Sequence, residues 1–201
     1  MFGLKSKKLP DCDDLFVKYL SPWYFEDERP KGTRPDMYVI AGYEGQSLDM
    51  ISLQYLNDEF LNRTKEQIDK ITKAALQDYQ EIIKSDNLNY GVLDAVDKHY
   101  DRKKIKEIIE NSDPTDYANQ YLVTICEFGA TIGKLFNEID GYDWLYSHPY
   151  FHSIIVHKNT GLGITVFDWA VKKFSEYGVN DGYVAKMYAA FETINKHETE
   201  R

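Results

Sequence analysis

The amino-acid sequence predicts a predominantly helical α+β single domain in which a small antiparallel β-hairpin packs on a central helix. Apolar residues recur at helical spacing through much of the chain, which favours helices. The stretch around Gly129 carries two adjoining apolar stripes, so a helix there must be covered by other elements. Two short apolar runs flank a turn at 158–161, which is the pattern of a hairpin.

The length of 201 residues is enough for one domain with its own hydrophobic core. We expect the globular domain to cover 11–196. It divides into an N-terminal helical part, 11–110, and a C-terminal helix–hairpin–helix part, 113–196. The terminal stretches 1–10 and 197–201 are expected to be flexible tails, because chain ends fray unless they are tied down.

The N-terminal part is predicted to be mostly helical. A short helix covers about Asp11 to Leu20, and a proline-rich irregular segment follows it. Residues 37–44, MYVIAGYE, have the apolar and aromatic content of a strand, although the start of a buried helix also fits. Three further helices are expected: one capped by Ser47 and running through Tyr55 and Phe60, one from a capping box at 64–67 to Lys84, and one over Val92–Glu110 with a break near Tyr100.

The central helix is predicted to begin at Asp113, an N-cap before Pro114, and to end before Gly141. Gly129 and Gly133 lie in one apolar stripe and cost about 1 kcal/mol each in helix propensity. We therefore expect another element to pack closely against them. Glu127 belongs to the remaining polar stripe, with Gln120, Thr124, Thr131, Lys134 and Glu138, and is expected to face water.

The hairpin is predicted from Phe151–His157 and Leu162–Thr165, with Gly161 in the left-handed conformation of the turn. Two helices follow it. Asp168 lies in the first turn of one, and Asn180 or Asp181 begins the other. Their buried faces are expected to hold Phe167, Ala170, Val171, Phe174 and Tyr177 in the first, and Val184, Met187, Tyr188, Phe191 and Ile194 in the second.

Composition excludes several classes of function. A net charge of −9 argues against nucleic acid as a partner, because a phosphate backbone requires a clustered positive face. No apolar run approaches the roughly 20 residues that span a bilayer, so we expect no membrane association. The two cysteines, Cys12 and Cys126, lie far apart and outside any metal-binding spacing, which is typical of the reducing cytoplasm.

Catalytic patterns are weak, and no cofactor motif is present. His152 and His157 are five residues apart on a predicted strand, so they point to opposite faces and cannot share one metal without a bulge, and His148 lies before Pro149 in a turn. Ser153 lacks the glycine context of a nucleophile elbow, and Cys126 lies on a packed helix face. The sequence therefore predicts no metal site. A hydrolase-like enzyme that uses histidine and aspartate residues of 143–157 is the alternative function.

The C-terminal half carries, in order, EFGATIG, Trp144, HPYF, TVFDWAVKKF and NDGYVAKMY, over about Gln120–Phe191. This order resembles uncharacterised bacterial domains in which a helix with a glutamate and small residues precedes a tryptophan-bearing loop, a hairpin and a helix pair. Some of these domains are similar to proteins thought to act as immunity partners of bacterial toxins. The resemblance implies a binding function and transfers no catalytic residue.

An acidic segment favours a basic protein partner, such as a toxin. Residues 107–143 hold eight acidic residues and one lysine, a local charge of −7, which attracts basic proteins. Trp144 and Phe151 are expected to fix the hairpin on the central helix. The alternative is that the acids only solvate the surface and that the tyrosines half-cover the core edge. The candidate partner-binding residues are Asp140, Tyr142, Asp143, Tyr146 and Tyr150.

Overall fold

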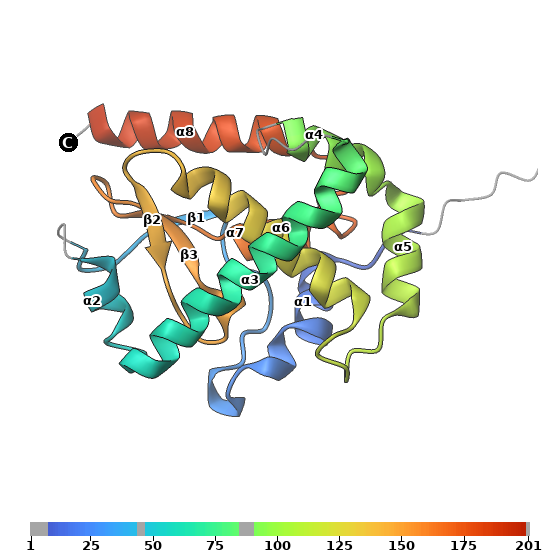
Figure 1. The fold of residues 1–201 in the computed structure, drawn as a ribbon, viewed down its shortest axis with the longest axis horizontal. Coiled ribbons are helices and arrows are strands. Elements are labelled where there is room, and N and C mark those ends of the chain that lie inside the picture. Colours follow the sequence, from blue (N-terminus) through green and yellow to red (C-terminus); the bar gives the residue numbers. More distant parts are fainter. Residues whose placement is uncertain (1–7, 44–46, 85–90, 200–201) are drawn as a thin grey trace, which may run out of the picture.

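The computed structural model describes residues 8–43, 47–84 and 91–199 (Figure 1). It confirms a predominantly helical α+β fold with a small antiparallel sheet. The helices are α1 (Cys12–Tyr19), α2 (Leu48–Ser52), α3 (Asp58–Ile83), α4 (Gly91–His99), α5 (Arg102–Asn111), α6 (Gln120–Asn137), α7 (Val166–Lys173) and α8 (Tyr183–Thr199), with single 3-10 turns η1 (Ser21–Trp23), η2 (Glu26–Glu28) and η3 (Tyr150–His152). The strands are β1 (Met37–Val39), β2 (Tyr142–Leu145), β3 (Ile154–His157) and β4 (Leu162–Ile164).

The sheet is antiparallel, with strand order β1-β4-β3-β2. The predicted hairpin is β3 and β4, and Gly161 has φ +70° in its turn. The segment predicted as a tryptophan-bearing loop is instead strand β2, in which Tyr142 and Trp144 are buried and Asp143 is exposed. Such alternation is the pattern of a strand with one packed face. The first strand of the hairpin begins at Ile154 instead of Phe151, since η3 precedes it.

Helix α6 crosses the centre of the molecule and is covered by α3, α5, α7 and one face of the sheet (Figure 1). The two glycines mark close packing, as predicted. A methyl group on Gly133 would overlap the indole ring of Trp144, and one on Gly129 would lie 2.6 Å from the ring of Phe167. Phe151 is also buried in this core. The small residues of α6 therefore position β2 and α7 against it.

Two predicted helix starts are wrong. Helix α6 begins after Asn119, whose side chain accepts a hydrogen bond from the Leu122 N–H, so the helix does not start at Asp113. Asp113 instead accepts hydrogen bonds from the backbone and side chain of Thr115, which forms a local turn that competes with a helix. Helix α3 begins after Asn57, and the predicted capping residue Thr64 lies inside it, donating to the Phe60 carbonyl.

The chain ends are tied more closely to the domain than predicted. Leu9 is buried, and its N–H donates to the Glu176 carboxylate, so the flexible tail does not extend to residue 10. Helix α8 continues to Thr199, where a loose tail from residue 197 was predicted. Residues 1–7 and 200–201 lie outside the described residues. Two residues predicted for the buried helix faces, Tyr177 and Tyr188, are 62% and 57% exposed.

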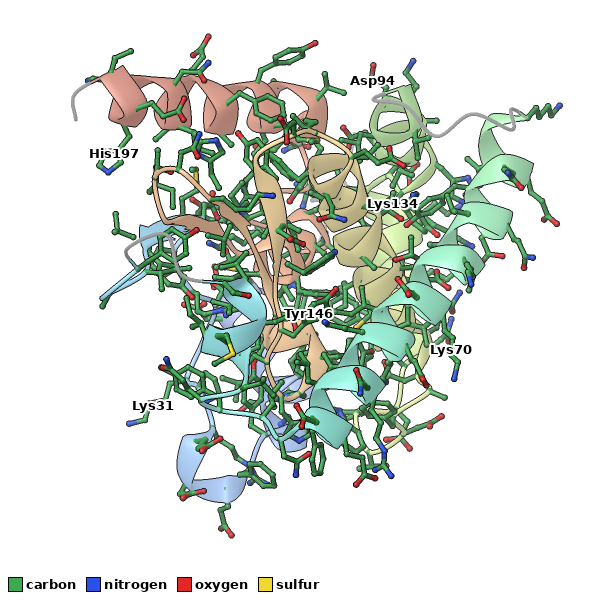
Figure 2. The ribbon with its side chains drawn as sticks, turned by 60° about the vertical axis from the view of Figure 1, so that its left-hand side comes forward. Lys31, Lys70, Asp94, Lys134, Tyr146 and His197 are labelled. Carbon is green, nitrogen blue, oxygen red and sulfur yellow. The ribbon has the colours of Figure 1, made fainter. Side chains whose placement is uncertain are left out.

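The face of the sheet that points away from α6 is covered by fewer residues. Helix α2 packs there, and Leu48 and Ile51 meet Ile154 and Val156 of β3 in a small separate cluster. Because α2 has only five residues, it does not reach across the whole sheet. Figure 2 shows Tyr146 between α2 and α3.

Candidate functional site: a groove beside helix α2

Two adjoining hollows lie beside α2, and we call them together the α2 groove. Tyr55, Ser147 and His152 line both. The first hollow, of about 480 Å³, is completed by Tyr38, Ile40, Ala41, Gly42, Ile51, Gln54, Leu145, Tyr146 and Ile154. The second, of about 350 Å³, is completed by Tyr24, Phe25, Glu28, Leu56 and His148.

Several large apolar side chains around the groove are exposed to solvent. Tyr55 is 77% exposed, Met50 63%, Phe25 59% and Phe60 42%. Tyr55 and Phe25 line the groove, while Met50 lies on α2 and Phe60 lies in the first turn of α3. A concentration of exposed aromatic residues beside a concave surface that combines apolar and polar side chains is typical of a binding site.

A buried ion pair between Arg34 and Asp168 lies next to His152, which lines the groove. Nε and Nη2 of Arg34 lie 3.0 and 2.7 Å from Oδ2 of Asp168, which is 1% exposed on α7. The Arg34 N–H donates to Oδ1 of Asp168, and Nη1 donates to the His152 carbonyl at 2.8 Å. Burial acts to lower the pKa of Arg34, but the Asp168 carboxylate outweighs it and raises that pKa. The pair therefore ties the irregular N-terminal segment to α7 and, through the His152 carbonyl, to a residue that lines the groove.

His152 and Tyr24 form the wall between this ion pair and the second hollow. The Tyr24 hydroxyl lies 2.9 Å from Nδ1 of His152. Burial, with the positive charge of Arg34, lowers the pKa of His152 to about 3, and burial raises the pKa of Tyr24 well above its usual value. Both side chains are therefore neutral at physiological pH, and the Arg34 charge is balanced by Asp168.

The structure separates the residues predicted to bind a partner. Tyr146 lines the first hollow, and Asp143 is exposed on β2 of the same sheet. Tyr142 is 7% exposed against Phe136 of the core, and Tyr150 is 6% exposed next to Phe151. These two tyrosines cannot serve as surface anchors in this structure. Asp140 is exposed in the turn between α6 and β2.

The acidic segment 107–143 does not form one surface. Its first acids lie on α5, at the opposite end of the molecule from α2 (Figure 1). Apart from Asp143, the acids beside the groove come from other parts of the chain. Three of the acids beside the groove lie close to Tyr146: burial raises the pKa of this tyrosine above its usual value, and the negative charges of Asp143, Asp69 and Asp49 raise it further. Glu28 lines the second hollow, directly after Glu26 and Asp27 in η2.

The three candidate histidines do not come together. His148 and His152 line the second hollow, whereas His157 ends β3, with Nδ1 3.1 Å from the Thr160 hydroxyl. Within the described residues, no histidine belongs to a group of three ligands within reach of one metal ion. His152 lies in the 3-10 turn η3, outside the strand in which it was predicted.

Glu127 is not the solvent-facing residue that the helix pattern predicts. It is half-buried beside α3, in an apolar hollow of about 260 Å³ that it shares with Cys126 and Tyr150. Burial, with the charge of Asp78, raises its pKa to about 7. The polar stripe failed as an indicator because its threonines are buried: Thr124 and Thr131 donate to the carbonyls four residues earlier, which satisfies their hydroxyls without water.

Cys126 is buried, as the sequence predicts, whereas Cys12 forms with Asp11 and Asp13 a group whose possible metal-ligand atoms lie within 4.8 Å of one another, although the sequence placed neither cysteine in a metal-binding pattern. Both cysteines are free and buried, and burial raises the pKa of Cys126 to about 12, which makes it an unreactive thiol. Among the described residues, no helix combines the length and the apolar content needed to cross a bilayer. A comparison of the chain with models of protein families, with curated proteins and with solved structures found no match.

Proposed function

We propose that this protein binds a basic protein partner non-covalently through the α2 groove, in a bacterial cytoplasm, and that binding neutralises or regulates that partner. The observation that carries the proposal is the groove itself, a concave surface of mixed polar and apolar lining bordered by exposed aromatic residues and by acids. The resemblance of the C-terminal half to immunity-like domains supports the same class of function.

The arrangement has the features of a protein interface. Aromatic side chains such as Tyr55 and Phe25 supply large contact area, and they are enriched among residues that dominate binding energy. Acids around the groove, such as Glu28 and Asp143, repel acidic partners and attract basic ones. The apolar lining of the first hollow, with Ile40, supplies the desolvated centre.

A hydrolytic enzyme fits the groove less well. A general base works best when its pKa lies near the operating pH. The low pKa of His152, about 3, makes it a weak base, and its Nδ1 is already bound to Tyr24. Ser147, which lines the same hollow, donates its backbone N–H to Ser153, and its hydroxyl has no hydrogen bond to a histidine among the described side chains.

The test uses a matched pair of arginine substitutions. Ala41 is exposed and lines the first hollow, so Ala41→Arg fills it and adds a repulsive charge. Ala189 is exposed on α8, so Ala189→Arg makes the same change outside the groove. Wild-type protein and both variants are used as bait in extracts of the native host. We expect the partner to be retained by wild type and by Ala189→Arg and lost by Ala41→Arg.

A partner retained equally by all three baits would place the interface outside the α2 groove. Affinity of the purified pair, measured by calorimetry, then gives the size of the effect. We expect Ala41→Arg to weaken binding at least about 100-fold, since it combines a steric clash with an unpaired charge at the interface.

A further inference from the structure

The second hollow of the α2 groove has aromatic walls. The ring centroids of Phe25 and His148 are 5.2 Å apart, and those of Phe60 and His148 are 5.9 Å apart. On the other side, the Tyr24 ring meets His152 edge to face, at 5.4 Å and 85°. Aromatic faces carry partial negative charge, so a hollow enclosed by several rings attracts cations.

The charged groups around this hollow favour a cation as well. Glu28 is exposed, and it is the one carboxylate among the residues that line the hollow, which include no lysine or arginine. Arg29 follows Glu28 directly and is exposed, but it does not line the hollow, and the two arginines that contact wall residues have partners of their own. Arg34 is held by Asp168, and Arg63 pairs with Glu59 and lies over the outer ring, Phe60.

We infer that the second hollow binds the guanidinium group of an arginine side chain presented by the basic partner. The inference rests on the proposed function and adds the chemistry of one contact to it. A guanidinium is flat and weakly hydrated, so it can lie against Phe25 or Tyr55 and pair with both oxygens of Glu28. A lysine ammonium is compact and strongly hydrated, and it pairs as a point charge.

The test uses short peptides and needs no native partner. Three capped pentapeptides, Gly-Ser-X-Ser-Gly with arginine, citrulline or lysine as X, are titrated into ¹⁵N-labelled protein and followed by NMR. Citrulline has nearly the shape of arginine without its charge. We expect the arginine peptide to bind with a Kd of about 1 mM. The shifted amides should belong to residues around the second hollow, 24–28 and 147–152. Lysine should bind several-fold more weakly than arginine, and citrulline at least about tenfold more weakly.

Variants locate the site. Glu28→Gln keeps the shape of an exposed side chain and removes its charge, so it should weaken the arginine peptide by about tenfold. Phe25→Ala should weaken it by several-fold. Tyr177→Ala removes an aromatic residue of similar exposure, 62%, away from the groove, and should change nothing. The peptide should also bind Ala41→Arg, because Ala41 lines only the first hollow.

Equal binding of arginine and citrulline, or no shift of the residues around the hollow with either peptide, would overturn the inference. A trimethyl-lysine peptide that binds more tightly than arginine would assign the hollow to a methylated ammonium instead. Failure of the proposed function gives a different result. A native partner that still binds the Ala41→Arg variant would exclude the groove as the interface, whatever the peptide titrations show.

Discussion

Arg34 and Asp168 matter to this fold because each is a buried charge with the other as its partner. Removing one member leaves an unpaired charge in a site with little water, a change that costs about 3–5 kcal/mol in other proteins. The pair also connects the segment before β1 to α7 and, through Nη1, to the His152 carbonyl. The shape of the α2 groove therefore depends on it.

We predict that Arg34→Leu lowers the free energy of unfolding by about 3–5 kcal/mol. The double variant Arg34→Leu, Asp168→Leu should be more stable than the single one, since it buries no unpaired charge. Urea unfolding of the wild type and the two variants measures both effects. A loss below about 1 kcal/mol in Arg34→Leu would mean that water reaches Asp168 and solvates it.

Glu127 predicts a pH dependence of stability. Its pKa is raised from 4.5 to about 7 in the folded protein, so between these values the folded state holds the proton more tightly than the unfolded state. Its contribution to stability therefore falls as the pH rises from about 4.5 to about 7 and is constant above that range.

Glu127→Gln removes the charge and keeps the size of the side chain. We predict that it raises stability at pH 8 by about 1 kcal/mol, after a discount for the partial exposure of Glu127, and changes it little at pH 5. Thermal melts of both proteins at the two pH values decide this. Near-silent behaviour at both pH values, the result expected for a residue that faces water, would show that solvent reaches the carboxylate freely.

At the scale of elements, the contact between α6 and β2 depends on the absence of a side chain at Gly133. Gly133→Ala gains about 1 kcal/mol in helix propensity, but its Cβ overlaps the Trp144 indole, and overpacking costs typically about 1–3 kcal/mol. We predict a net loss of stability in Gly133→Ala and severe destabilisation in Gly133→Leu. Gly182→Ala is the control, because its Cβ would meet open space. It should be neutral or slightly stabilising. Equal melting temperatures for Gly133→Ala and the wild type would mean that Trp144 shifts at little cost.

Most of the helices and the hairpin could be predicted from the sequence, because local residue patterns determine them. Helix α1, the break between α4 and α5 near Tyr100, and the turn at Gly161 all follow from local helix and turn patterns. Strand β2 was missed because its four residues carry one clear alternation, too little to separate a strand from a loop.

The groove could not be predicted in the same way. Its two hollows combine side chains from segments more than 100 residues apart, such as Tyr24 and His152. Asp168 was interpreted as a first-turn acid, because nothing local indicates that Arg34 would reach it. The shortness of α2, which leaves the groove open, did have a sequence signal: Asn57 is a good helix cap, and a helix that starts there must end the preceding one.

At the scale of the whole molecule, no histidine among the described residues belongs to a group of three possible metal ligands, which leads to a prediction about zinc content. Protein purified without chelator and without a metal-affinity tag should contain no stoichiometric zinc by elemental analysis. About one zinc per chain, lost in His152→Ala, would contradict this and revive the enzyme alternative. His157→Ala serves as the control, since His157 lies on β3 away from the second hollow.

The net charge of −9 raises the question of whether a basic partner responds to total charge or to its local distribution. Two double variants separate these, since each removes two negative charges: Glu26→Gln, Asp27→Asn beside the second hollow, and Glu107→Gln, Glu110→Gln on α5. Electrostatic steering acts over about a Debye length, roughly 8 Å at physiological salt, so charges that flank the interface dominate it.

We therefore predict that Glu26→Gln, Asp27→Asn slows association with the native partner by several-fold at low salt and makes the rate less sensitive to salt, with little change in dissociation. The α5 pair should leave both rates nearly unchanged, because α5 lies at the end of the molecule opposite α2 (Figure 1). Association kinetics at two ionic strengths, measured with the partner identified by capture, make the comparison. Equal slowing by the two variants would mean that the partner responds to the total charge of the protein. Slowing by the α5 pair alone would move the docking surface to the acidic residues of 107–116 and away from the α2 groove.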